Sequence, residues 1–400
     1  MKIPDNSALI SLLFNSGSNR AEQLGNMALR ELDKGLGEFT GKNYELAITS
    51  FERAIRLSPR GESAVNAYDY KARAQLSQGN KDGAIESYKQ ALKIDPTRDD
   101  LHALLGNIHT TEQRFAEAAA QYELAVKNNP SAANRYSLGQ GYMAAGRLDE
   151  AKAQFEMVKT LSPKEPFGNF GLGQVLSKQE NYEEAISAFK AAIDIKSDYW
   201  EAFSEMGNAL ANRGDFDQAA EIANTLRGND DLMSFSLSNY IYEKSNPKMT
   251  AVYSSDLYAL FPSKLGPGTQ LSGINVYLQT ANAEKTMSMV FQFSKEMDAR
   301  SVENTFNWKI ERAIGTGRGD GYNYDMRLKD SEVALQPNPI AVYYDQKEQT
   351  ATVLFKLRQN DAANGTIDPS HINFIFTGND SLGLSMDKSA DMYSGFSGFA

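Results

Sequence analysis

The chain contains no cysteine among its 400 residues, and it has only three histidines and two tryptophans. The missing thiols exclude disulfides, thiolate chemistry and cysteine-based metal sites. No apolar run approaches the roughly 18 residues that a membrane-spanning helix needs. The short apolar stretch Ala8–Phe14, interrupted by Ser11, is not typical of a classical secretory signal peptide. The formal net charge of −10 argues against nucleic acid and anionic membrane surfaces as partners.

A repeat of about 34 residues runs through the first half of the chain. Its most regular member is an alanine, at positions 47, 84, 118, 151, 185 and 219. An aromatic residue follows four positions later in five units: Phe51, Tyr88, Tyr122, Phe155 and Phe189. A small residue precedes each alanine by twelve positions: Gly35, Ala72, Gly106, Gly139, Gly173 and Gly207. A proline closes four of the units: Pro59, Pro96, Pro130 and Pro163.

The unit predicts two helices that approach each other closely at their small residues. The aromatic residue lies one turn beyond the alanine on the same face of the second helix. Proline ends that helix because it lacks a backbone donor. This pattern resembles the tetratricopeptide repeat over residues 28–233, which implies an α-solenoid of about six repeats. Two departures stand out: the additional residues Gly61–Ser63 after the first unit, and Ala223 where the sixth unit lacks its aromatic residue.

The hydrophobic period changes from helical to twofold after the repeats. Pro and Gly gather in Phe261–Thr269, and the strand candidates beyond it suggest an all-β sandwich. These candidates are Ile274–Thr280, Thr286–Phe293, Phe306–Ile310, Ile340–Tyr344, Ala351–Leu357 and Ile372–Phe376. The sequence therefore predicts a flexible lead over 1–27, a repeat array over 28–245 whose last helix caps it, a linker over 246–271, and a sandwich with an acidic tail over 272–400.

The segment Phe293–Thr305 (FSKEMDARSVENT) is the most distinctive stretch of the second half. It resembles a bacterial Ig-like module in which a strand ends in Phe-Ser-x-x-Met-Asp and a short helical turn begins near Ser-Val. Val342–Lys356 resembles the paired strands of that module around a Tyr-Asp turn, and Gly365–Gly378 resembles its closing segment. The resemblance implies a surface or secreted bacterial protein. The compartment stays open between export by a non-classical route and the cytoplasm.

Patterns that carry chemistry are few. His102 and His109 are spaced to share a helix face, but a metal site is not favoured. Gly315–Gly321 (GTGRGDG) opens no helix and so indicates a loop, within which Arg318-Gly319-Asp320 spells an adhesion triplet of common chance occurrence. The carboxylates Asp380, Asp387 and Asp391 form no twelve-residue calcium loop and indicate a solvated acidic tail. We therefore expect no enzyme and no cofactor.

The family resemblance places the first helices of successive units along a concave groove. The ninth positions of these helices project into it: Arg73, Asn107, Gln140, Gln174 and Asn208. Side-chain amides both donate and accept, so such a column suits the backbone of an extended peptide. Tyr136 and Phe170, at fifth positions, add two aromatic surfaces for an apolar anchor. The alternative is that the amides merely follow the family pattern and stabilise neighbouring units.

Two functional hypotheses follow. The favoured one is a non-enzymatic scaffold that binds a peptide or a partner helix in the groove, while the Ig-like domain docks, spaces or self-associates. The alternative is a structural subunit of a bacterial surface or extracellular assembly built by packing of both domains. An enzyme with an accessory repeat domain would need a catalytic site in the last 125 or so residues, and no pattern there predicts one.

Overall fold

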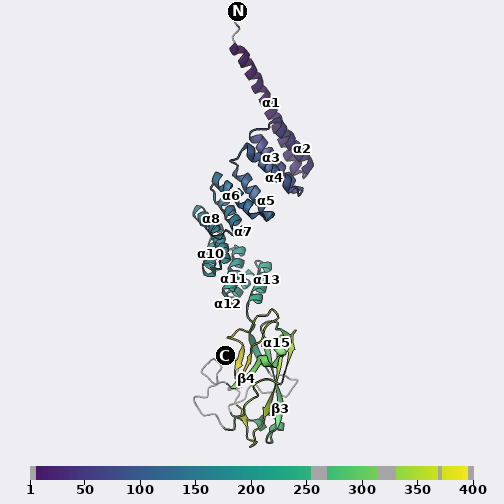
Figure 1. Cartoon of the computed structure of the whole chain (residues 1–400), viewed down its shortest axis with the longest axis vertical. Coiled ribbons are helices and arrows are strands. Elements are labelled where there is room, and N and C mark those ends of the chain that lie inside the picture. The colour runs from purple at the N-terminus through teal and green to yellow at the C-terminus, as the bar shows by residue number, and fades with distance from the viewer. Residues whose placement is uncertain (1–5, 254–267, 313–329, 368–371, 395–400) are drawn as a thin grey trace, which may run out of the picture. The chain divides into compact units, whose positions relative to one another are not determined.

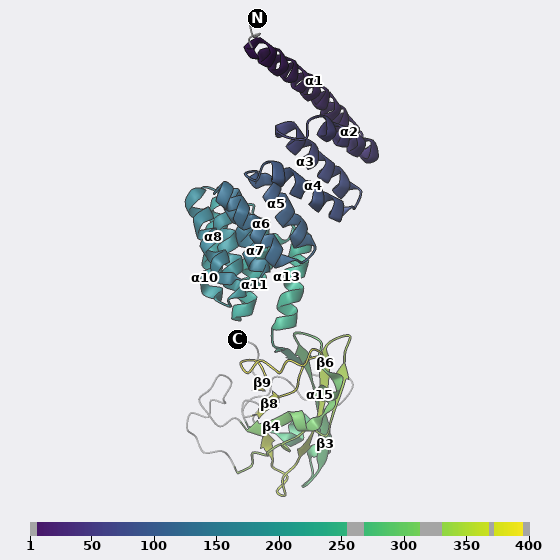
Figure 2. The same ribbon diagram turned by 45° about the horizontal axis from the view of Figure 1, so that its top comes forward.

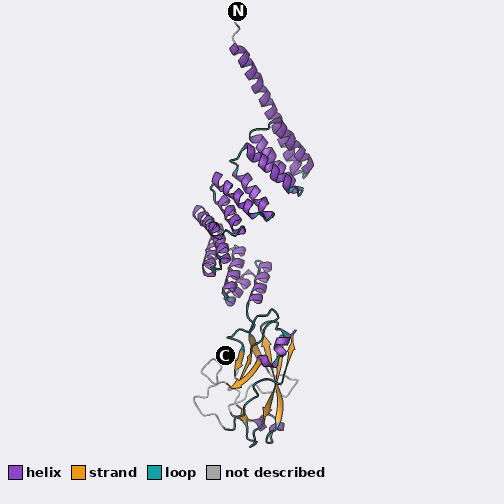
Figure 3. Cartoon of the chain, viewed as in Figure 1, coloured by secondary structure: helices purple, strands orange, loops and turns teal. Residues whose placement is uncertain are grey.

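The computed structural model describes residues 6–253, 268–312, 330–367 and 372–394 (Figure 1). The chain divides into two compact units, residues 1–237 and 238–400. Helices make up the first unit and strands dominate the second (Figure 3). The loop with Arg318-Gly319-Asp320 and most of the Pro/Gly-rich segment Phe261–Thr269 lie outside the described residues.

The first unit is a row of helices that pack in consecutive pairs, which Figure 2 shows from a second direction. Its helices are α1 (Asn6–Thr40), α2 (Tyr44–Leu57), α3 (Glu62–Ser77), α4 (Lys81–Ile94), α5 (Asp99–Thr111), α6 (Phe115–Asn128), α7 (Ala132–Ala144), α8 (Leu148–Leu161), α9 (Phe167–Lys178), α10 (Tyr182–Ile195), α11 (Trp200–Arg213) and α12 (Phe216–Leu226), with the start of α13 (Asp231–Lys244). The predicted repeat register is confirmed, because each of the six alanines lies on a second helix and is fully buried.

In four of the six helix pairs, a glycine on the first helix lies in close contact with an aromatic ring on the second. A Cβ atom added to Gly106 would lie 2.5 Å from Tyr122 Cε1, and one added to Gly173 would lie 2.5 Å from Phe189 Cε1. Since real Cβ atoms do not approach so closely, the ring lies where any larger side chain would stand. Gly35 and Gly139 meet Phe51 and Phe155 in the same way.

The turns between paired helices also follow the repeat. Their left-handed residue falls at Lys42, Gly79, Gln113, Gly146, Glu180 and Gly214, with φ between +59° and +97°. Three of the six turns use a glycine at this position, and the other three hold a non-glycine residue in the same conformation, which is uncommon outside glycine and asparagine.

The sequence predicts a flexible lead over residues 1–27, but this segment is covered from Asn6 onward by helix α1. It is one continuous helix of 35 residues, whereas its partner α2 has 14. At about 1.5 Å per residue, α1 extends far beyond the length that α2 can cover. Among the α1 side chains that the structure describes, the first buried one is Ala28, where the sequence places the start of the repeats.

The second unit contains two main antiparallel sheets. One has the order β1-β3-β6-β5 and the other β4-β8-β9, while β2 pairs with β7. The strands are β1 (Met249–Tyr253), β2 (Thr269–Gln270), β3 (Glu284–Phe293), β4 (Trp308–Arg312), β5 (Ala341–Asp345), β6 (Thr350–Arg358), β7 (Thr366–Ile367), β8 (Ile372–Phe376) and β9 (Met392–Ser394). The short helices are α14 (Leu271–Ile274), η1 (Val276–Leu278), α15 (Ala299–Glu303) and η2 (Thr305–Asn307).

Aromatic side chains join the two main sheets in one core. The ring of Phe291 on β3 lies 5.2 Å from Trp308 on β4 and 5.3 Å from Phe374 on β8. Phe293 lies 5.4 Å from Phe376. The alternation predicted for β3 is confirmed, because Met287, Met289, Phe291 and Phe293 all enter this core. The unit is therefore a β-sandwich.

Two sequence predictions for this unit were wrong. The segment Ile274–Thr280 forms the end of α14 and the short helix η1 instead of a strand. Asn275 explains the difference, because its side chain accepts a hydrogen bond from the backbone N–H of Tyr277 at 3.0 Å and so turns the chain locally. The expected linker over 246–271 includes β1, which pairs with β3 in the larger sheet.

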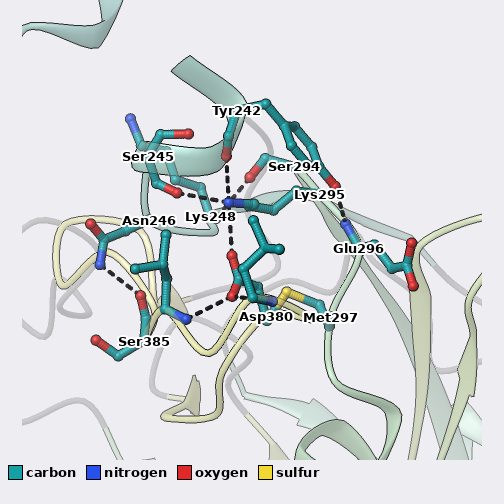
Figure 4. A network of polar contacts seen from close by, with 12 residues as sticks. Tyr242, Ser245, Asn246, Lys248, Ser294, Lys295, Glu296, Met297, Asp380 and Ser385 are labelled. Atoms are coloured by element: carbon teal, nitrogen blue, oxygen red, sulfur yellow. Dashed lines mark hydrogen bonds and ion pairs between the residues drawn. The ribbon is translucent and has the colours of Figure 1, made fainter. Parts of the chain in front are cut away.

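A buried lysine fixes the segment that enters the second unit (Figure 4). Lys295 Nζ lies 2.7 Å from Asp380 Oδ2 and donates to the backbone oxygens of Tyr242 at 2.6 Å and Ser245 at 2.9 Å. These three acceptors match the three N–H bonds of an ammonium group. Asp380 is thus an internal ion-pair partner, not part of a solvated tail as the sequence suggested.

Candidate functional site

The candidate site lies on the exposed side of the first helices of repeats four to six, which are α7, α9 and α11. We call it the first-helix surface. Positions are counted so that Gly139, Gly173 and Gly207 are the eighth residues of these repeats. The second, fifth, sixth and ninth positions then belong to the surface: Ala133, Tyr136, Ser137, Gln140, Phe167, Phe170, Gly171, Gln174, Glu201, Ser204, Glu205 and Asn208.

Two of the predicted amides meet across neighbouring repeats. Gln140 Nε2 donates to Gln174 Oε1 at 3.2 Å and to the hydroxyl oxygen of Tyr136 at 3.1 Å. The two glutamines are one repeat apart in the sequence, and both are half-buried. Among the described residues, Gln140 Oε1 and Gln174 Nε2 have no hydrogen-bond partner. The pair therefore offers one acceptor and one donor to an incoming backbone.

The other ninth-position residues are arranged differently. Asn107 Oδ1 on α5 accepts a hydrogen bond from the Tyr122 hydroxyl at 2.7 Å. Arg73 Nε on α3 donates to Asp69 Oδ1 at 2.8 Å, and this bond raises the pKa of Arg73 above its usual value. Asn208 on α11 is half-buried. The structure thus brings Gln140, Gln174 and Tyr136 together, whereas Arg73 and Asn107 bond within their own repeats.

Four aromatic residues form what we call the aromatic cluster: Tyr136, Phe167, Phe170 and Tyr199. Phe170 is only 8% exposed and packs against Phe189 and Tyr199, at ring distances of 5.9 and 4.9 Å. Phe167 is 46% exposed, and its ring lies 6.0 Å from Tyr136 and 6.3 Å from Tyr199. Phe170 therefore supports the cluster from below, while Phe167 offers its accessible surface.

Phe167 and Tyr199 are the two members of the aromatic cluster that the sequence analysis missed. For Phe167, the available signal was its place three residues before Phe170, which is one helical turn along the same face. Burial raises the pKa of Tyr136, and burial with the nearby Tyr136 and Glu201 raises the pKa of Tyr199 to about 12. Both phenols are therefore neutral at neutral pH.

Charge on the first-helix surface has one sign. At the positions defined above, the charged residues are Glu201, which is exposed, and Glu205, which is half-buried. Three cations lie elsewhere on these helices, and one of them, Arg213 at the end of α11, pairs with Glu183 and Asp215. Arg135 Nη1 donates to Gln154 Oε1 on α8, and Lys178 lies in the last turn of α9.

The remaining sequence candidates do not converge on a site. His102 Nδ1 lies 2.8 Å from Gln121 Oε1, and His109 is separately buried. Asp387 accepts hydrogen bonds from Ser389 and lies 3.6 Å from Lys248 Nζ. No group of three or more potential metal ligands occurs in the described part of the chain, and no helix there is long and apolar enough to cross a membrane.

A cavity of about 890 Å³ was not predicted from the sequence. It opens between the segment Pro59–Glu62, the start of α3 and the residues Lys93–Asp95 at the end of α4. Gly61 and Glu62, two of the additional residues noted after the first repeat, line this cavity.

Comparison with known proteins matches the helical unit. A family model described as TPR repeat matches residues 72–111 and 173–214, and one described as Tetratricopeptide repeat matches residues 101–166. The chain is 34% identical over 116 residues to Small glutamine-rich tetratricopeptide repeat-containing protein 2 of Mycosarcoma maydis, covering 28% of this chain and 29% of that protein. It is 25% identical over 183 residues to the Hsp70-Hsp90 organizing protein of Triticum aestivum, covering 44% and 30%.

The chain thus spans less than a third of the length of these relatives. Among solved structures, a tetratricopeptide repeat protein from Parabacteroides merdae superposes with a TM-score of 0.49 at 17% identity, covering 54% of this chain and 86% of that one. The residues that the family models match include four of the six buried alanines, at positions 84, 118, 151 and 185, and three of the four glycine–ring contacts. The helical unit of this chain is therefore an array of tetratricopeptide repeats.

Proposed function

We propose that this chain is a non-enzymatic scaffold that binds an extended peptide or a partner helix on the first-helix surface of repeats four to six. The observation that carries the proposal is the pair Gln140–Gln174 beside the exposed ring of Phe167. The amides supply hydrogen bonds to a backbone of any sequence, and the ring supplies an apolar anchor. The sandwich, which we assign to the bacterial Ig-like module, docks or spaces the array.

One further observation supports a binding role. A relative named above is called an organizing protein for Hsp70 and Hsp90. A clamp of lysines and arginines is not present at the second, fifth, sixth and ninth positions of repeats four to six, so the partner differs from an acidic chain end.

The test is selection of random peptides displayed on phage against the immobilised full chain, followed by affinity measurement with a labelled selected peptide. Replacing Phe167 by Ala is expected to weaken binding by about 2 kcal/mol, and replacing Gln140 and Gln174 by Ala by roughly 0.5–1.5 kcal/mol each. The matched control is Leu161→Ala, a side chain 49% exposed on the second helix α8. Peptides that bind all variants alike would place recognition elsewhere.

The alternative, a subunit of an assembly, is favoured by one observation. Leu232 and Phe235 on α13 are 75% and 64% exposed at the end of the array, where a solenoid is usually capped by polar residues. Sedimentation of the full chain over a concentration series separates the two functions. An assembly subunit is expected to form large species that Leu232→Ser with Phe235→Ser abolishes, and a scaffold is expected to stay small.

A further inference from the structure

The charges around the aromatic cluster indicate which peptide this surface fits. This inference rests on the proposed function and adds the partner's chemistry to it. Glu201 occupies in repeat six the position that Phe167 occupies in repeat five, and Glu205 follows one turn later on the same face. Both carboxylates thus lie on the same first-helix surface as the exposed apolar anchor, one repeat further along the array.

These carboxylates are not engaged by the rest of the protein. Neither forms an ion pair or a side-chain hydrogen bond among the described residues, whereas other acids of the array do: Glu183 pairs with Arg213, and Glu123 and Glu150 pair with Arg147. Glu201 lies close enough to Tyr199 to raise the pKa of that phenol, which connects it to the aromatic cluster. Negative charge here is therefore available to a partner.

The spacing sets the register of the partner. Packed helices lie about 8–10 Å apart, so equivalent positions on α9 and α11 are separated by a similar distance. An extended peptide advances about 3.3 Å per residue, so roughly three residues bridge the two positions. When the anchor of the peptide contacts Phe167, the side chain about three residues away reaches the carboxylates. A lysine or an arginine suits this place, because a cation complements the charge of two unpaired glutamates.

We propose that the first-helix surface recognises an extended peptide with a lysine or arginine about three residues from an apolar or aromatic anchor. The anchor covers Phe167 and Tyr136. The backbone on the other side of the anchor, over repeats four and five, bonds to the Gln140–Gln174 pair, and the cation lies between Glu201 and Glu205 of repeat six. A peptide with an acidic residue at that place meets uncompensated negative charge and is rejected.

The probe is a random twelve-residue peptide library displayed on phage and selected on the immobilised full chain. Selected peptides are expected to carry Lys or Arg about three residues from an apolar residue. The Glu201→Gln/Glu205→Gln variant is expected to bind a selected peptide about fivefold more weakly than the unaltered chain does, because exposed ion pairs contribute modestly to binding. This difference shrinks at high salt. Selection on Glu201→Lys/Glu205→Lys is expected to enrich Asp or Glu instead.

The matched control is Glu156→Gln/Glu184→Gln, two exposed glutamates on the second helices α8 and α10. It is expected to leave affinity unchanged. Peptides that depend on Phe167 yet show no basic preference, and bind the Glu201→Gln/Glu205→Gln variant normally, would overturn this inference and leave the proposed function standing. A selection that yields no peptide whose binding depends on Phe167, Gln140 or Gln174 would overturn both this inference and the proposed function.

Discussion

The side chain of Leu237 lies directly over Gly207. A Cβ atom added to Gly207 would come within 2.3 Å of Leu237 Cδ2, as close as the rings of Tyr122 and Phe189 come to Gly106 and Gly173. Those rings belong to the second helix of their own repeat, but the sixth repeat has Ala223 where its ring would be. Leu237, from the next helix α13, fills the position that the sixth repeat leaves empty.

The first prediction concerns this contact. Leu237→Ala is expected to destabilise the end of the array by about 2–4 kcal/mol, because the truncation leaves a cavity over Gly207. Thermal unfolding followed by helical circular dichroism of the full chain measures the effect. Leu232→Ala, which alters a side chain on the same helix that is largely exposed, is the control and is expected to change stability by less than about 0.5 kcal/mol. Equal melting of both variants would contradict the assigned role of Leu237.

The second prediction tests the repeat register. Ala118 is fully buried between the helices of repeat three, so Ala118→Leu is expected to cost roughly 1–3 kcal/mol through overpacking. The loss should extend to repeats two and four, because neighbours stabilise one another in a solenoid. Ala120→Leu adds the same atoms on the exposed side of the same helix and is the control. Hydrogen exchange resolves which repeats lose protection, and protection retained throughout would refute the register.

The sequence predicted the repeats well because each carries its own packing signal. A small residue on one helix and a ring on the next define a contact that recurs at a fixed spacing. The burial of Phe170 was not predictable in this way. Its partner Tyr199 precedes α11 and belongs to no repeated feature of the sequence, so the contact that buries Phe170 and leaves Phe167 exposed is visible only in the structure.

The Lys295–Asp380 pair shows a second limit of sequence analysis. The two residues are 85 positions apart, and neither lies in a repeated pattern. Asp380 was grouped with Asp387 and Asp391 because all three are close in sequence. The structure instead joins Asp380 to Lys295, which follows the end of β3. Strands β3, β4, β5, β6 and β8, in contrast, were predicted from local alternation alone. Long-range polar pairs leave no periodic signal.

The third prediction concerns pH. Burial, followed by the nearby Arg114, lowers the pKa of His109 in the folded protein, and its Nδ1 has no hydrogen-bond partner. The unfolded chain then binds a proton more readily, so stability is full above the unfolded pKa near 6.5 and falls as pH decreases below it. His109→Leu, which introduces the residue found at the equivalent positions 176 and 210, is expected to reduce this loss between about pH 6.5 and 5. Melting temperatures that decrease equally with decreasing pH in both proteins would contradict this prediction.

The fourth prediction concerns the buried ion pair in the sandwich. Lys295→Met leaves Asp380 Oδ2 and two backbone oxygens without their donor, and is expected to cost roughly 3–5 kcal/mol. Asp380→Asn retains an oxygen for the backbone N–H groups of Leu382 and Leu384, but removes the charge that faces the ammonium. The double variant is expected to be less destabilised than the sum of the single ones by more than about 1 kcal/mol, because neither charge then stays buried alone.

One tryptophan in each unit allows this cycle to be measured in the full chain. Trp308 is buried in the core of the sandwich, and Trp200 lies in the helical unit, so a Trp200→Phe background reports unfolding of the sandwich alone. Urea titrations of the four proteins in that background give the coupling free energy. Lys356 and Glu284, an ion pair with both side chains more than a third exposed, form the control cycle, in which coupling of only about 0–1 kcal/mol is expected. If the Lys295–Asp380 cycle couples no more strongly than this surface pair, the lysine acts through the backbone oxygens of Tyr242 and Ser245, and the carboxylate contributes little.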